Sequence, residues 1–172
     1  MMRRLLSTTA VAAGAAALVL ATAMPASAHA IVDLTGKQAY AGKTSVMTLE
    51  IQHGCLQNGK GINKVVAYFA KPYRKVVAAP VDGWTSSTKR TSKGRKVVWT
   101  LRGTAPAFGT PTYFPMTISW PKKPGAYGLP VKQWCGKATN VWDVPDGPAT
   151  ANQPSPPLYP LPQVRVLPAP TK

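Results

Sequence analysis

The residue with the most distinctive chemistry in this chain is His29, because residues 1–28 have the features of a secretory signal peptide. They combine an arginine pair near the start, an alanine-rich apolar run and a small-residue Ala-Ser-Ala cleavage signature that ends at Ala28. Cleavage there would leave His29 as the first residue, with a free α-amine and an imidazole on one amino acid. Two such nitrogens can chelate Cu(II), which prefers nitrogen ligands in tetragonal or square-planar geometry. The sequence therefore predicts a secreted, extracytoplasmic protein with a copper site at its N-terminus.

His53 is the only other histidine of the chain. It follows a predicted strand over residues 45–51 and directly precedes Gly54 and Cys55. A strand over residues 29–34 that pairs beside residues 45–51 would bring both histidines to one end of a sheet. A carboxylate or a water molecule would then complete a four-coordinate site. The alternative is that His53 is a turn residue that hydrogen-bonds the loop next to the cysteine.

The two cysteines, Cys55 and Cys135, both lie in the part of the chain that is predicted to be exported. An even number of cysteines in an oxidising compartment favours a disulfide bond between them. Its long loop would stabilise the fold by roughly 4 kcal/mol in the chain-entropy model. The rival interpretation is a pair of copper thiolates.

The charge of the chain is strongly positive. There are 21 basic and five acidic residues, for a net charge of +16, and removal of Arg3 and Arg4 with the signal leaves 19 basic residues and a net charge of +14. Such a charge favours anionic partners, here cell-wall polymers or lipid head groups. A specific nucleic-acid role is not indicated, because no recognition-helix pattern is visible and the protein is predicted to be exported.

Residues 29–172 are expected to form one all-β domain, either a sandwich or a barrel. No long segment has helical periodicity. Residues 89–96 are expected to form a basic hairpin tip, residues 145–162 an extended Pro-rich segment, and residues 163–167 an edge strand. The remaining predicted strands are rich in β-branched and aromatic residues and bounded by turn residues; they are 45–51, 64–70, 75–79, 96–101, 113–120 and 127–134.

The order and spacing of several motifs resemble the YcnI-like domain family over residues 29–167. The matching segments are His29-Ala30-Ile31-Val32, Ile51-Gln52-His53-Gly54-Cys55, Val97-Val98-Trp99, Pro130-Val131-Lys132-Gln133-Trp134-Cys135 and Trp142-Asp143-Val144-Pro145. The resemblance implies an immunoglobulin-like β-sandwich with a Pro-rich C-terminal segment. It also implies that Cu(II) is bound through a histidine brace formed by His29, with the indole of Trp142 close to the metal. A non-enzymatic role in copper homeostasis follows, with delivery to a copper-trafficking partner.

The chain departs from the family at residues 56–63, which contain no acidic residue where many relatives place one. His53 or Asp143 is therefore expected to supply the remaining ligand. Trp142 has ordinary core packing as its alternative role.

Two other functions stay open at this point. One is a copper enzyme similar to lytic polysaccharide monooxygenases, with His53 as the second histidine of the brace, and the other is a basic envelope-binding module without metal.

Overall fold

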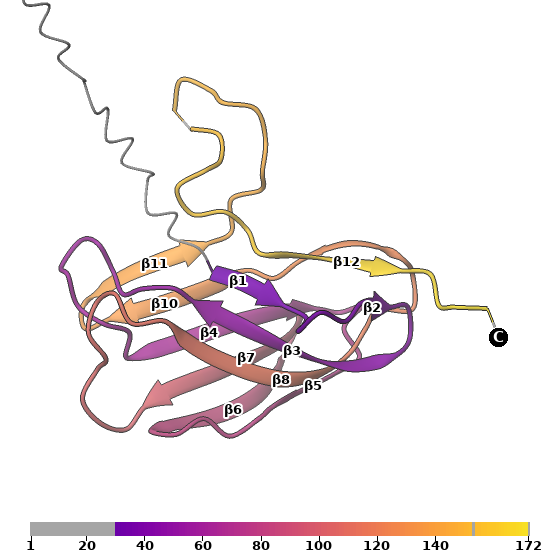
Figure 1. The fold of residues 1–172 in the computed structure, drawn as a ribbon, viewed down its shortest axis with the longest axis horizontal. Coiled ribbons are helices and arrows are strands. Elements are labelled where there is room, and N and C mark those ends of the chain that lie inside the picture. Colours follow the sequence, from indigo (N-terminus) through magenta and orange to yellow (C-terminus); the bar gives the residue numbers. More distant parts are fainter. Residues whose placement is uncertain (1–29, 153, 172) are drawn as a thin grey trace, which may run out of the picture.

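The chain folds into twelve β-strands in the computed structural model, which describes residues 30–152 and 154–171 (Figure 1). Within these residues there is no α-helix, and so none that is long and apolar enough to span a membrane. The strands are β1 (Ala30–Asp33), β2 (Ala39–Tyr40), β3 (Thr44–Ile51), β4 (Lys64–Ala70), β5 (Lys75–Ala78), β6 (Trp84–Thr91), β7 (Gly94–Leu101), β8 (Thr112–Ser119), β9 (Gly125–Gly128), β10 (Val131–Cys135), β11 (Ala138–Trp142) and β12 (Gln163–Leu167).

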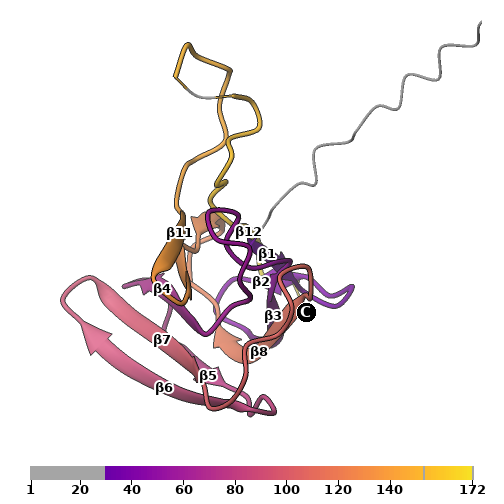
Figure 2. The ribbon, with the colours of Figure 1, turned by 90° about the vertical axis from the view of Figure 1, so that its left-hand side faces the viewer.

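Two of the sheets form the layers of a sandwich (Figure 2). One has the strand order β1-β3-β8-β5 and the other β11-β10-β4-β7-β6, and every neighbouring pair in both is antiparallel. A third sheet, of order β2-β12-β9, lies beside β1, because side chains of β1 and β12 line one groove.

Alternation along the strands builds the core between the two layers. Leu49 and Phe114 are partners across β3 and β8, Val65 and Trp99 are partners across β4 and β7, and all four side chains are fully buried. Full burial of an apolar side chain of this size contributes about 1.5–3 kcal/mol. The period-2 pattern of apolar residues therefore determines which face of each strand points inward.

The predicted strands at 45–51, 64–70, 75–79, 96–101 and 113–120 are all confirmed, with end points that differ by at most two residues. The prediction of one strand over 127–134 was wrong. Tyr127 and Gly128 belong to β9 and residues 131–134 belong to β10, and these two strands lie in different sheets. The chain leaves one sheet for the other at Leu129 and Pro130, where Pro130 has no N–H to continue a ladder and Leu129 donates its N–H to the carbonyl of Pro162.

Two other expectations about strands need correction. Residues 163–167 form β12, which is the central strand of its sheet and not an edge strand, because it pairs with β2 in parallel and with β9 in antiparallel orientation. The basic hairpin over 89–96 is confirmed, but most of it is strand and the turn itself is Ser92-Lys93. Gly94 follows that turn with a φ of 146°, and any β-carbon there would collide with the carbonyl of Phe69.

The disulfide between Cys55 and Cys135 is present and fully buried. The two α-carbons are 5.7 Å apart and the residues are separated by 80 positions in the sequence. Cys55 lies in the loop after β3 and Cys135 ends β10, so the bond connects the two layers of the sandwich. The cysteines are therefore a cross-link and not copper thiolates.

We predict that the double substitution Cys55→Ala/Cys135→Ala lowers the free energy of unfolding by about 2–5 kcal/mol. The reason is that the unfolded chain regains the freedom that a long closed loop removes. Urea denaturation of the oxidised native protein and of the double variant measures the difference. Reduced native protein is the control and should unfold close to the variant, and a loss below about 1 kcal/mol would contradict the role of the bond.

Candidate functional site

The start of β1 lies at one end of the sheet, beside the loop that follows β3. Ala30 is the register partner of Ile51, and Ile31 is the partner of Glu50. Since His53 comes two residues after Ile51, the first described residue of the chain and the His53 loop are neighbours at this end. The expected pairing of the N-terminal strand with the strand at 45–51 is thus confirmed for Ala30–Asp33. His29 itself lies outside the described residues.

His53 is half-buried and held by two contacts. Its ring packs at 34° on Phe108 with 5.1 Å between ring centroids, and its Nδ1 lies 2.6 Å from the carbonyl oxygen of Gly54. A carbonyl oxygen only accepts hydrogen bonds, so Nδ1 donates and carries the proton. In the neutral ring with this tautomer, the lone pair is on Nε2, which is the arrangement of a metal-binding histidine. His53 also hydrogen-bonds its own loop, as the alternative interpretation predicts, but it precedes the turn, which is residues 56–59.

The loop geometry explains why glycine separates His53 from Cys55. A β-carbon at Gly54 would collide with the backbone carbonyl of Lys60, because the loop folds back on itself there. The N–H of Cys55 donates to that same carbonyl over 3.1 Å. The disulfide fixes the next residue, so the His-Gly-Cys segment has little freedom to move.

A buried polar chain links Trp142 to the His53 loop. The indole N–H of Trp142 donates to Oε1 of Gln133 over 3.0 Å, and Nε2 of Gln133 donates to the carbonyl oxygen of His53 over 3.1 Å. Trp142 is 1% exposed and packs edge-to-face on Tyr159. The indole therefore has the core-packing role, and through Gln133 it also helps to hold the backbone of His53.

Two acidic residues near the start of β1, Asp146 and Glu50, were not among the ligands predicted from the sequence. Asp143 is exposed and directly follows β11, whereas Asp146 lies three residues further on in a groove of about 280 Å³ that Ala30 and Ile31 also line. Glu50 is half-buried across the strand pair from Ile31. Asp146 lies just beyond the Trp142-Asp143 motif in the sequence, but its place beside β1 depends on the fold.

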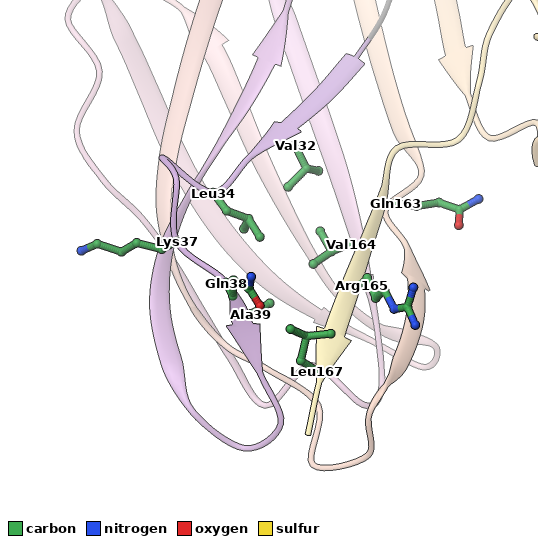
Figure 3. Close-up of a pocket in the computed structure, with 9 residues that line it drawn as sticks. All are labelled: Val32, Leu34, Lys37, Gln38, Ala39, Gln163, Val164, Arg165 and Leu167. Carbon is green, nitrogen blue, oxygen red and sulfur yellow. The ribbon is translucent and has the colours of Figure 1, made fainter. Parts of the chain in front are cut away.

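A second groove beside β1 has a different chemistry (Figure 3). The side chains of Val32, Leu34, Val164 and Leu167 point toward one another, while Lys37 points away from the groove. Its lining holds no histidine, cysteine or carboxylate. This groove lies between β1 and β12, and the one carboxylate that lines either groove is Asp146, in the groove near Ala30.

Within residues 30–152 and 154–171, no three His, Cys, Asp or Glu side chains are grouped closely enough to hold a metal ion. His53 and Asp143 were expected as ligands together with His29, and the described part of the chain contains two of these three residues. The geometry so far brings His53, Asp146 and the start of β1 to one end of the sandwich.

Comparison with known proteins supports the fold. An uncharacterized protein from Nocardia farcinica, whose crystal structure was described as an immunoglobulin-like fold, superposes with a TM-score of 0.65 at 22% sequence identity. The alignment covers 81% of this chain and 99% of that one. The expected immunoglobulin-like β-sandwich is thereby confirmed. No family model matches the chain and no curated protein matches it, so the YcnI-like family stays a prediction.

We predict that Gln133→Met lowers the free energy of unfolding by about 1–3 kcal/mol, because the buried N–H of Trp142 and the carbonyl of His53 both lose their partner. Urea denaturation measures the change. Gln38→Met is the matched control, since Gln38 is exposed and should change stability by less than about 0.5 kcal/mol. Equal stability of the two variants would show that the buried hydrogen bonds do not hold the His53 loop.

Proposed function

We propose that the exported protein binds Cu(II) at the start of β1 and acts in copper homeostasis, as a non-enzymatic buffer or carrier outside the cytoplasm. One observation carries the proposal. Ala30 is at the same time the register partner of Ile51, next to the His53 loop, and a lining residue of the groove that contains Asp146. A mature chain that begins at His29 would therefore start beside a nitrogen donor and an oxygen donor.

The donor set fits a Cu(II) ion. His29 would supply its α-amine and imidazole, His53 would supply Nε2, and Asp146 or Asp143 would supply a carboxylate oxygen. Nitrogen and oxygen ligands of this kind suit the tetragonal geometry of Cu(II). The bond from Nδ1 of His53 to the carbonyl of Gly54 supports this role, because metal-binding histidines donate their other ring N–H to such an acceptor.

The local charge also supports a cation site in a basic protein. Of the five acidic residues of the chain, Asp33 and Glu50 lie on β1 and its partner β3, and Asp146 lies in the groove beside β1. Exposed charges further away than about 8–10 Å are screened at physiological salt. The positive charge elsewhere on the surface therefore opposes copper binding less than the net charge suggests.

Trp142 has an indirect part in this proposal. Its indole N–H is a donor only and is already bonded to Gln133, so it does not coordinate copper. It keeps Gln133 in place, and Gln133 in turn holds the carbonyl of His53. The proposal agrees with the resemblance to the YcnI-like family, with Trp142 near the site and the brace at His29.

We predict that copper affinity depends on the free α-amine of His29. Protein that begins at His29 should bind one Cu(II), and a variant with one extra residue before His29 should bind it orders of magnitude more weakly, because an amide replaces the amine and the chelate is lost. Electron paramagnetic resonance during Cu(II) titration follows binding, and intact mass checks each N-terminus. Equal affinity of the two forms would refute the histidine brace.

We predict that His53→Ala removes one nitrogen from the hyperfine pattern, and that Asp146→Asn lowers the affinity for Cu(II) by about tenfold or more, which is at least the effect of losing a supporting group. Asp82→Asn is the control: it makes the same charge change just before β6 and should leave the affinity unchanged within about twofold. An unchanged spectrum for His53→Ala would assign His53 to the loop alone. If Asp146→Asn binds like Asp82→Asn, Asp146 is not a ligand, and Asp143→Asn then tests the other predicted carboxylate.

A further inference from the structure

The outer surface of the five-stranded sheet carries lysines interleaved with aromatic side chains. The inward residues of β4, β7 and β10, such as Ala67, Val97 and Val131, are fully buried, so alternation turns their neighbours outward. Tyr68, Lys96 and Lys89 follow one another across β4, β7 and β6, and Trp134 lies opposite Lys64 across β10 and β4. We call this surface the lysine face; it consists of Lys64, Lys89, Lys96, Lys132, Tyr68 and Trp134.

None of the five acidic residues of the chain lies on a strand of this sheet. Asp82 precedes β6, and Asp143 follows β11. The lysine face therefore has no carboxylate of its own on the strands to neutralise it. This sets it apart from the start of β1, beside which Glu50 and Asp146 lie.

The positive charges on and beside this face are placed against one another. Lys89 is the direct partner of Lys96, and Arg90 is the direct partner of Arg95. Like charges directly opposite each other destabilise a strand pair. An anion bound on this face would relieve the Lys89–Lys96 pair. The Arg90–Arg95 pair is the next in register and points to the opposite side of the sheet, where Nη2 of Arg95 donates to the carbonyl of Arg74.

Two further ammonium groups converge on one aromatic ring. The Nζ atoms of Lys64 and Lys132 lie 4.8 Å and 5.0 Å from the centroid of the Trp134 ring. Cation–π attraction of this kind holds a cation near the ring and restricts the side chain. Both lysines are thereby held beside the Trp134 ring before any ligand arrives.

We propose that the lysine face binds a linear anionic glycan, a polysaccharide that carries carboxylate or phosphate groups along its length. Neighbouring strands are about 4.8 Å apart, so lysines from β10 to β6 span about 14 Å, enough for several acidic groups of an extended polymer. A membrane surface fits less well, because few large apolar side chains on this face are exposed enough to insert; Tyr68 is 40% and Val141 39% exposed. This proposal is independent of copper, since the face lies on the layer that does not contain β1.

Binding to polygalacturonate and to phosphorylated dextran tests the proposal, with neutral dextran as the blank and isothermal titration calorimetry as the measurement. The variant Lys64→Gln/Lys89→Gln/Lys96→Gln/Lys132→Gln should raise the Kd at fixed ionic strength by about tenfold or more and weaken its salt dependence. The matched control Lys37→Gln/Lys43→Gln/Lys122→Gln/Lys123→Gln removes the same charge from exposed positions outside this sheet. It should change the Kd by less than about twofold.

Circular dichroism shows whether each variant is folded, and the Cu(II) titration shows whether it keeps its copper site. The glycan-binding proposal can therefore fail or succeed separately from the copper-binding proposal. The charged polymer that binds more tightly identifies whether the face prefers carboxylate or phosphate groups. Equal weakening by the two sets of substitutions would reduce the effect to net charge and overturn the proposal. It would also be overturned if neither charged polymer binds, or if a single-stranded 20-mer DNA or phosphatidylglycerol vesicles bind the face more tightly than both.

Discussion

The disulfide between Cys55 and Cys135 is the constraint on which the candidate site depends. It joins the loop after β3 to the end of β10, and therefore one layer of the sandwich to the other. Gln133, two residues before Cys135, adds a buried hydrogen bond to the carbonyl of His53 next to the same cross-link. A covalent bond and a buried polar chain thus hold His53 in place at the end of the sheet where β1 begins. Without them, the short loop around Gly54 would keep its own hydrogen bonds and its contacts with Phe108, whose carbonyl accepts the N–H of Gly54 over 2.7 Å.

Two regions of opposite character follow from how the charges are distributed over this frame. Three of the five carboxylates lie on or beside β1 and β3, whereas the strands of the other layer carry lysines and arginines without an acidic residue. Because exposed charges act over only about 8–10 Å in physiological salt, each region can attract its own kind of ligand. The net charge of the whole chain therefore describes neither region.

Much of the fold was predictable, because a strand with one buried face leaves a period-2 pattern. The segment 45–51 has that pattern and forms β3, which begins one residue earlier. The segment 64–70 was predicted from its β-branched and aromatic residues and forms β4 with the same bounds. The pattern does not show where a chain changes sheets, so the break at Leu129-Pro130 was missed. It also fails for β6, in which every residue after Trp84 is exposed and polar, and which is a strand because its backbone pairs with β7. The motif around Trp142 was the reason to predict this residue near the site. It could not show the hydrogen bond from Trp142 to Gln133, because that bond depends on how β10 and β11 pair.

By itself, the sequence determined the all-β class, most of the strands and the pairing of its only two cysteines. These follow from local patterns and from counting, and they need no knowledge of distant contacts. Only the tertiary structure decided that Asp146 shares a groove with Ala30, that Gln133 links Trp142 to His53, and that four lysines and two aromatic rings form one face. Each of these joins residues that are far apart in the chain or on different strands, and the pairing of strands into sheets is decided by burial of the whole core at once.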